Sequence, residues 1–431
     1  MKQTISKIII VFFCLNTLLL WASGKESISQ IASNPYISIS QITALLAVVL
    51  ASINLILSTK ISILEDFFDG LDKVYSVHRT TGALSFVFML THPILLVIDA
   101  LPNVELASYY LIPGKDISYN FGIIAAFFSI LAFIFIVFIK IPYRLWLTTH
   151  RFLGISFIFI GLHTLLISSD ISTNLYLRIW IILFLTVGLI SFLYIVLAYR
   201  FIGPKYYYEI AKITRELDVV NLYLKPRKRS INFQPGQFVY LSFLDKKLGG
   251  EFHPFSISSS PKEELVRISA KILGDFTIKL PEAEEGQKVI LYGPYGKFAQ
   301  KYLSGKFREI VWIAGGIGVT PFLSLLRNET QKALGKRITF FYSFKSEYEA
   351  LFDDEIKNLI KDHGFIDYIP WNTKTRKRLN ANIVAEKITE IQNVLILICG
   401  PLRMMQDLKK QFLNLGVAEK NIIFENFAFL E

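Results

Sequence analysis

The sequence predicts a multi-domain membrane protein, in which a six-helix transmembrane bundle precedes an antiparallel β-barrel and a parallel α/β domain. Three observations support this fold class. Of the 431 residues, 52% are hydrophobic, more than an ordinary soluble protein carries. Six apolar stretches in the first half are long enough to cross a bilayer. After Gly203-Pro204 they give way to short alternating segments and polar turns.

The six predicted spans lie within residues 1–202, the transmembrane domain. Lys2 and Lys7 ahead of a short first stretch also suit a signal peptide, but no clean cleavage motif follows, so we expect a retained helix. Basic residues gather in the loops on one side of the spans, which predicts that both ends of the bundle face the cytoplasm. The spans are Ile8–Trp21, Ile39–Leu57, Val74–Ile98, Phe121–Ile139, Leu145–Ile167 and Leu175–Phe201.

The net charge of +11 does not indicate a nucleic-acid-binding protein, because the basic residues are scattered through loops beside the spans. Membrane lipid and nucleotide phosphates are the expected partners instead. The only cysteines are Cys14 and Cys399, which predicts neither a disulfide framework nor a thiolate metal site. We expect an integral protein of the cell (inner) membrane, with cytoplasmic soluble domains; an obligate protein partner stays unknown.

The soluble part divides into two predicted domains. Residues 203–300 contain short strands and Pro/Gly turns, which predict an antiparallel barrel. Residues 301–431 alternate strands with helical stretches, which predicts a parallel α/β domain.

Four of the six histidines lie within predicted spans, where an ionisable side chain is costly unless it has a partner or a function. His78 and His92 are 14 residues apart in the third span, which places them on nearly one face, about 21 Å apart. His150 and His163 share the fifth span at a similar separation. Two level-matched pairs favour two bis-imidazole haem sites over one zinc or copper site, whereas interhelical hydrogen bonding is the alternative for any single histidine.

The fifth span contains a geometric difficulty. Thirteen residues leave His150 and His163 about 140° apart around an ideal helix. We therefore expect a bulge or kink between them, for which Gly154 and Gly161 leave room.

The segments His78–Gly82 through His92 and His150–Gly154 through His163 resemble the ferric reductase and NADPH oxidase transmembrane family. The resemblance implies that the third and fifth helices carry two b-type haems, the inner one on His78 and His150 and the outer one on His92 and His163. These residues would be electron carriers, and no catalytic acid, base or nucleophile is expected. Basic residues near the span ends could meet haem propionates or anchor the bundle: Arg79, Arg151 and Arg178.

Two segments of the barrel domain predict FAD binding. His253–Ser256 follows a strand-like stretch, where a hydroxyl and exposed backbone can bond a flavin ring. Lys271–Thr277 ends a strand and opens a short helix, where a pyrophosphate could meet free backbone N–H groups. Both resemble flavin signatures of the same family. A resemblance to the ferredoxin reductase type of module, carried by the turns described in the next paragraph, implies that a C-terminal aromatic, Phe427 or Phe429, covers the flavin. The expected FAD-binding residues are His253, Pro254, Phe255, Ser256, Lys271, Gly274, Phe276, Thr277 and Phe429.

The α/β domain contains a glycine loop, Ala314–Pro321, between an apolar strand and a helix, where glycine permits close approach of phosphate. With Gly293–Gly296 before it and Cys399-Gly400-Pro401 after a later strand, it resembles the ferredoxin reductase type of nicotinamide-binding domain. Ser343 and Lys345 end the second strand and favour NADPH over NADH, although Glu347 and Glu349 could repel the extra phosphate. The expected NAD(P)-binding residues are Gly315, Gly316, Gly318, Thr320, Pro321, Ser343, Lys345, Cys399, Gly400 and Pro401.

These cofactors imply an NAD(P)H oxidoreductase that passes electrons through FAD and two haems to an external acceptor. Loop charges at the outer side are balanced, which favours dioxygen, giving superoxide, over an anionic ferric chelate. A membrane electron donor to a partner redox protein or quinone is a second class of function. A haem-containing sensor or proton channel is a third, which the complete flavin and nicotinamide module disfavours.

Overall fold

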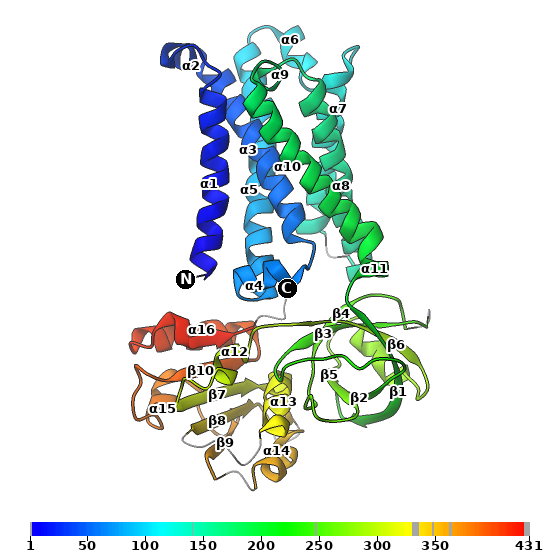
Figure 1. The fold of residues 1–431 in the computed structure, drawn as a ribbon, viewed down its shortest axis with the longest axis vertical. Helices are drawn as coiled ribbons and strands as arrows, with labels where there is room; N and C mark the ends of the chain where they lie inside the picture. Colours follow the sequence, from blue (N-terminus) through cyan, green and yellow to red (C-terminus); the bar gives the residue numbers. More distant parts are fainter. Residues whose placement is uncertain are drawn as a thin grey trace. The chain divides into compact units, whose positions relative to one another are not determined.

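The structure is a computed structural model that describes residues 2–139, 141–245, 248–329, 336–346, 349–361 and 364–425. The chain forms two compact units: the residues up to Gly203, apart from Gly70–Asp72, form the first, and Gly70–Asp72 with the residues from Pro204 onward form the second. The first unit is helical and the second contains two β-sheets (Figure 1). Each unit is described by itself below.

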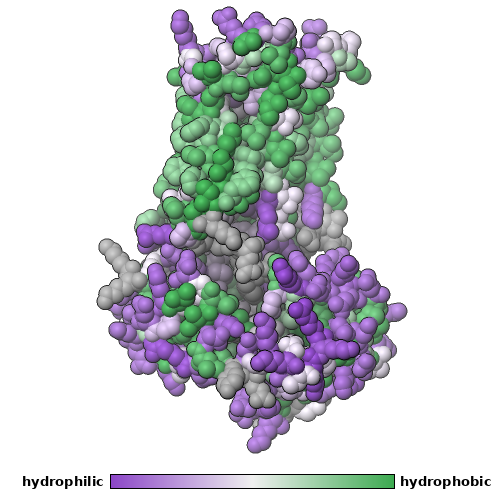
Figure 2. All heavy atoms as spheres, turned by 180° about the vertical axis from the view of Figure 1, so that it is seen from behind, coloured by the Kyte–Doolittle hydropathy of each residue, from purple (hydrophilic) through white to green (hydrophobic). Residues whose placement is uncertain are grey.

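Among the residues that the structure describes, the helical unit has six helices long and apolar enough to cross a membrane, as the sequence predicts. Its exposed surface between the ends of the bundle is largely apolar, and hydrophilic side chains gather at the end formed by α2, α6 and α9 (Figure 2). Such an apolar band is what a lipid environment requires. The long helices are α1 (Lys2–Ala22), α3 (Pro35–Leu57), α5 (Leu71–Ala100), α7 (Ile117–Val137), α8 (Tyr143–Leu166) and α10 (Leu175–Leu193), which continues through a π-helical turn (Tyr194–Ala198) into α11 (Tyr199–Ile202). The short connecting helices are α2 (Ile28–Ser33), α4 (Ser62–Phe68), α6 (Val104–Tyr109) and α9 (Asp170–Thr173).

Small and polar residues let the long helices approach closely. Ser156 Oγ donates to the Ala125 carbonyl at 2.7 Å and lies 2.6 Å from Ser129 Oγ, which joins α7 to α8. A Cβ on Gly154 would lie only 2.0 Å from the ring of Phe192, so this glycine seats an aromatic ring of α10 against α8. Close packing and short hydrogen bonds replace the hydrophobic effect, which does not drive helix association in lipid.

The sequence predicts a bulge or kink in the fifth span, and the bulge is a wrong prediction. The helix α8 is α-helical from Tyr143 to Leu166, and a π-helical turn lies in the sixth span instead. Gly154 serves packing against Phe192, as described above. Side-chain rotamers of histidine swing the ring around the helix axis, so two rings can reach their partners from an uninterrupted helix.

The first sheet of the second unit is the predicted antiparallel barrel, with strand order β4-β3-β6-β1-β2-β5. All its strand pairs are antiparallel. Alternating apolar residues such as Leu222, Leu241 and Ile268 fill its interior. The strands are β1 (Lys205–Glu216), β2 (Val219–Pro226), β3 (Phe238–Phe243), β4 (His253–Ser256), β5 (Val266–Lys271) and β6 (Lys288–Tyr295), and a 3-10 helix covers Thr277–Glu282.

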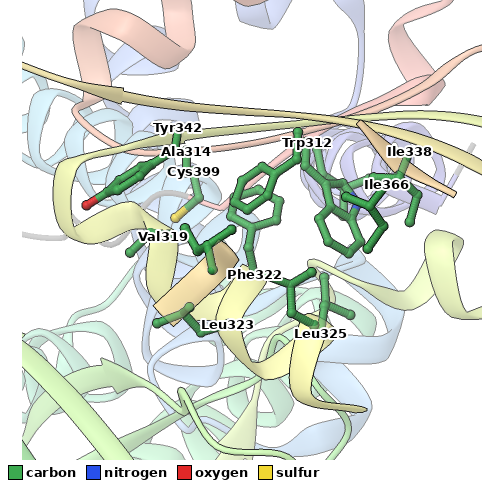
Figure 3. Close-up of a cluster of buried hydrophobic side chains, with 14 of the residues drawn as sticks. Trp312, Ala314, Val319, Phe322, Leu323, Leu325, Ile338, Tyr342, Ile366 and Cys399 are labelled. Atoms are coloured by element: carbon green, nitrogen blue, oxygen red, sulfur yellow. The ribbon is translucent and has the colours of Figure 1, made fainter. Parts of the chain in front are cut away.

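The second sheet is fully parallel, with strand order β11-β10-β7-β8-β9, as the alternation of strands and helices predicts. Figure 3 shows one of its two cores, in which Trp312 and Ile338 of the sheet pack against Phe322 and Leu325 of α13. The strands are β7 (Glu309–Gly315), β8 (Arg337–Phe344), β9 (Ile366–Asn372), β10 (Leu395–Cys399) and β11 (Ile422–Phe424). The helices are α12 (Gln300–Leu303), α13 (Thr320–Asn328), α14 (Asp353–Ile360), α15 (Ala381–Ala385) and α16 (Leu402–Asn414), with 3-10 turns at Gly316–Val319 and Glu419–Asn421.

Candidate haem, flavin and nicotinamide sites

The four intramembrane histidines form two pairs. The ring centroids of His78 and His150 are 6.1 Å apart, and those of His92 and His163 are 6.3 Å apart. Each pair joins α5 to α8, and the two pairs are separated by 14 residues along α5, about 21 Å. The structure therefore brings together the pairs that the sequence predicts.

The ring separations fit a metal ion held between two imidazoles. A metal–imidazole nitrogen bond is about 2.0 Å, and the nitrogen lies about 1.1 Å from its ring centre, so opposed rings on one metal have centroids roughly 6.2 Å apart. The described residues contain no group of three or more His, Cys, Asp or Glu side chains that could hold a metal ion. A two-ligand site of this kind suits a haem iron, whose remaining four ligands come from the porphyrin.

Backbone carbonyls fix the protonation of three of these rings. The Nδ1 atoms of His78, His92 and His163 lie 3.0, 3.1 and 2.7 Å from the carbonyl oxygens of Asn54, Ser40 and Ser118. Because a carbonyl only accepts, the proton must be on Nδ1, and Nε2 keeps its lone pair for a metal.

His150 is held in a different way. Its ring stacks on Trp146, one helical turn earlier, at 5.0 Å and an interplanar angle of 10°. Its buried Nδ1 has no hydrogen-bond partner among the residues that the structure describes. Ring stacking therefore sets the orientation of this fourth imidazole.

Two glycines make room for the histidine sites. A Cβ on Gly82 would lie 2.9 Å from Asn54 Nδ2, and a Cβ on Gly122 would lie 3.0 Å from His163 Nδ1. Gly82 belongs to the His78–Gly82 motif, whereas no motif in the sequence points to Gly122. The basic residues Arg79, Arg151 and Arg178 are all exposed.

The candidate flavin site lies on β4 and the loop after β5. The ring of His253 stacks on Phe276 at 3.9 Å, and Phe255 lies 6.0 Å from the same ring. Burial lowers the pKa of His253, and its neighbour Glu251, 3.2 Å away, opposes this shift. The imidazole and two phenyl rings thus gather beside Pro254 and Ser256 of β4.

The loop from Lys271 to Thr277 has fewer free amides than expected. The backbone N–H groups of Leu273 and Gly274 both donate to Thr277 Oγ1, at 2.8 and 2.9 Å. Lys271 pairs with Asp218 at 3.1 Å. The threonine hydroxyl therefore shapes the loop, and those two amides are not available to a pyrophosphate. The predicted flavin cover Phe429 and its alternative Phe427 lie outside the described residues.

The residues predicted to bind the nicotinamide cofactor converge at the carboxyl ends of β7, β8 and β10. Ala314 pairs with Cys399, and Gly315 pairs with Ser343, so the glycine loop lies between two strand ends. A Cβ on Gly318 would lie 2.4 Å from the Cys399 carbonyl oxygen. The chain reverses its strand order between β7 and β10, which is where parallel α/β sheets bind nucleotides. Around this edge lie Gly316 in the 3-10 turn, Thr320 and Pro321 at the start of α13, and Gly400 and Pro401 after β10.

The end of β8 carries both signs of charge. Lys345 follows the strand, and its backbone N–H donates to the carboxylate of Glu349 at 3.2 Å. The cation that favours a 2′-phosphate therefore has an acidic side chain beside its backbone. Glu347 lies outside the described residues.

A buried acid beside the predicted nicotinamide turns is not apparent from the sequence. Glu425, directly after β11, is 3% exposed and adjoins Gly296. Burial, with Glu425 nearby, raises the pKa of the Cys399 thiol.

The sequence also gives no indication of an ion-pair cluster within the second unit. Arg267 of the barrel is 4% exposed and binds both oxygens of Glu355 on α14 at 2.8 Å. Arg327 of α13 binds the same carboxylate at 2.9 Å, so one acid links the barrel to the α/β domain. The local sequence around these residues carries no signal of such long-range pairing.

Three known protein families match successive parts of the chain. The ferric reductase like transmembrane component family matches residues 43–161, an FAD-binding domain family matches 208–299 and an oxidoreductase NAD-binding domain family matches 312–410. Flavohemoprotein A of Dictyostelium discoideum is 26% identical over 234 residues, 50% of this chain and 58% of that protein. A superoxide-generating NADPH oxidase heavy chain of the same organism is 34% identical over 130 residues, 26% of this chain and 18% of that protein. The chain thus covers less than two thirds of either relative.

A flavohemoglobin structure from Malassezia yamatoensis is similar in fold, with a TM-score of 0.51 and 18% identity over 92% of this chain and 98% of that one. The three matched families, in this order, follow the helical unit, the barrel and the parallel sheet. The chain is thus similar to ferric reductases and NADPH oxidases: its first unit matches a ferric reductase like transmembrane component, and its second unit matches an FAD-binding domain and an oxidoreductase NAD-binding domain.

Proposed function

We propose that this chain passes electrons from cytoplasmic NAD(P)H through FAD and two b-type haems to an acceptor outside the cell membrane, with dioxygen as the favoured acceptor and superoxide as the product. The observation that carries the proposal is the pair of imidazole sites, 6.1 and 6.3 Å between ring centroids, at two levels of one helix bundle. When bound, NAD(P)H supplies a hydride, FAD converts two-electron into one-electron transfer, and the haems carry single electrons.

The residues of the chain bind and orient in this scheme. His78 and His150 would hold one haem, and His92 and His163 the other. The turn after β7 and the turn after β10 would hold the nicotinamide cofactor, and β4 with the loop after β5 would hold FAD. With two histidines of the chain holding each haem, the haems would supply one-electron transfer to an external acceptor that does not bind the metal.

The orientation follows from the basic loops, which favour the cytoplasm at the His78 and His150 end. The acceptor preference rests on charge. Lys25, a cation near the opposite end, is already paired with Asp170 at 2.7 Å and bonded to Gln41 at 3.0 Å. It offers little attraction to an anionic chelate, and a neutral acceptor needs none. The similarity to a superoxide-generating NADPH oxidase supports the same acceptor.

The first test counts haems. Pyridine haemochrome should give two b-type haems per purified chain, and His92→Ala should lose one of them while flavin reduction by NADPH continues. One haem or none in the unaltered chain would contradict the two-site arrangement. Loss of flavin reduction in His92→Ala would contradict the serial order.

The second test addresses the acceptor. The chain with FAD, haem and NADPH should reduce cytochrome c in air, and superoxide dismutase should abolish that signal. Ferric-chelate reduction is the alternative function, favoured by the match to the ferric reductase like family. Fast chelate reduction under argon with negligible superoxide in air would select that alternative and leave the electron path unchanged.

A further inference from the structure

The helices α3 and α5 are joined by a ladder of hydrogen bonds at intervals of seven residues. Ser40 contacts His92, Ser85 Oγ donates to the Ala47 carbonyl at 2.9 Å, and Asn54 contacts His78. Seven residues are close to two helical turns, so the contacts stay on one face of each antiparallel helix. The two end contacts therefore fall at the two levels of the histidine pairs.

Both end contacts have the same reciprocal form. At one level, Ser40 Oγ donates to the His92 carbonyl at 3.0 Å, and His92 Nδ1 donates to the Ser40 carbonyl at 3.1 Å and lies 2.7 Å from Ser40 Oγ. At the other level, Asn54 Nδ2 donates to the His78 carbonyl, and His78 Nδ1 donates to the Asn54 carbonyl at 3.0 Å. In each case the side chain of the α3 residue donates to the backbone carbonyl of the histidine, and the backbone carbonyl of the α3 residue accepts from the histidine ring.

The middle contact has no such form. Ser85 donates once to a carbonyl, and neither Ser85 nor Ala47 touches an imidazole in a contact described here. Polar side chains often join membrane helices, and a single hydrogen bond of this kind needs no further explanation. The repetition of a two-way contact at both histidines, and only a one-way contact between them, distinguishes the ends of the ladder from ordinary interhelical bonding.

We propose that Ser40 and Asn54 are positioning residues for His92 and His78, and that each holds the reduction potential of its own haem low. This inference rests on the proposed haem sites. A carbonyl that accepts the Nδ1 proton makes the imidazole a more basic ligand and fixes its orientation. A more basic ligand favours ferric over ferrous iron. Weakening the reciprocal hydrogen bonds at one histidine should therefore raise the reduction potential of the haem held by that histidine alone.

The test is a spectroscopic redox titration of the full chain, together with low-temperature EPR of the ferric haems. Ser40→Ala should raise the reduction potential of the haem held by His92 and His163, so that its oxidised-to-reduced ratio at a fixed solution potential falls threefold to tenfold. A tenfold fall corresponds to 59 mV for a one-electron couple. Asn54→Ala should do the same for the other haem only. Gly82→Ala, whose Cβ would lie 2.9 Å from Asn54 Nδ2, should act like Asn54→Ala without deleting that side chain.

Ser85→Ala is the matched control, because it removes a buried hydrogen bond between the same helices away from either histidine. It should leave both potentials and both EPR signals unchanged. If two haems are still bound, either of two results would overturn the inference. One is that Ser40→Ala and Asn54→Ala leave the potentials unchanged, and the other is that Ser85→Ala shifts them equally. A chain that binds no haem would instead overturn the proposed function, and this inference with it.

Discussion

Gly318 lies where the two turns proposed to bind the nucleotide touch, and it offers the sharpest test of the proposed nicotinamide site. A Cβ at this position would lie 2.4 Å from the Cys399 carbonyl oxygen, 2.5 Å from its carbonyl carbon and 2.7 Å from Gly400 Cα. All three atoms belong to the backbone, so no side chain can rotate away. Carbon contacts are favourable near 3.5 Å, so Gly318→Ala should push the turns apart by about 1 Å.

A displacement of this size matters because both turns carry predicted contacts to one cofactor. Misplacement by about 1 Å can cost ~10²-fold in rate. We expect Gly318→Ala to lower kcat/KM for flavin reduction roughly 10- to 100-fold, equivalent to about 1.4–2.7 kcal/mol. The loss should appear with both NADPH and NADH, because the shared part of the cofactor meets these turns.

The assay is stopped-flow bleaching of the flavin under argon, which reports this step before any haem is involved. FAD content should be unchanged, since the barrel is not altered. Gly364→Ala is the control, because the added Cβ meets nothing within 4 Å. An unchanged kcat/KM in Gly318→Ala, with normal FAD content, would show that the turns do not hold the cofactor.

Three further predictions concern the soluble unit. Lys345→Ala should raise KM for NADPH more than for NADH, since only NADPH carries the extra phosphate; equal effects in steady-state assays would mean that the ribose site is misplaced. Glu355→Gln should lower the free energy of unfolding of the second unit by about 2 kcal/mol, or ~4–8 °C in Tm, because the buried Arg267, 4% exposed, loses its charge partner. Lys357→Ala, which removes an exposed ion pair with Asp353, should lower Tm far less in the same thermal scan. Burial raises the pKa of Cys399 above its usual 9.0, so the thiol should stay protonated and resist iodoacetamide from pH 7 to 9; rapid labelling of this residue by mass spectrometry would contradict its burial.

The sequence by itself determined the architecture and the positions of the haem candidates. Apolar length predicts the spans, because a bilayer imposes one minimum length on every helix that crosses it. The 14-residue spacing of His78 and His92 predicts two levels, because helix rise is constant. The glycine loop after β7 is readable for a similar reason, since only a local turn is needed to bring backbone close to phosphate.

Only the tertiary structure decided which residues support these sites. Ser40 and Asn54 are ordinary polar residues in an apolar stretch, and their contacts depend on the antiparallel register of α3 against α5, to which no local pattern refers. The pairing of Arg267 with Glu355 joins residues 88 positions apart. The uninterrupted helix α8 shows the same limit, because backbone angles alone do not fix where the His150 and His163 rings lie. Local sequence fixes spacing along one element, whereas contacts between elements depend on packing that only the folded chain defines.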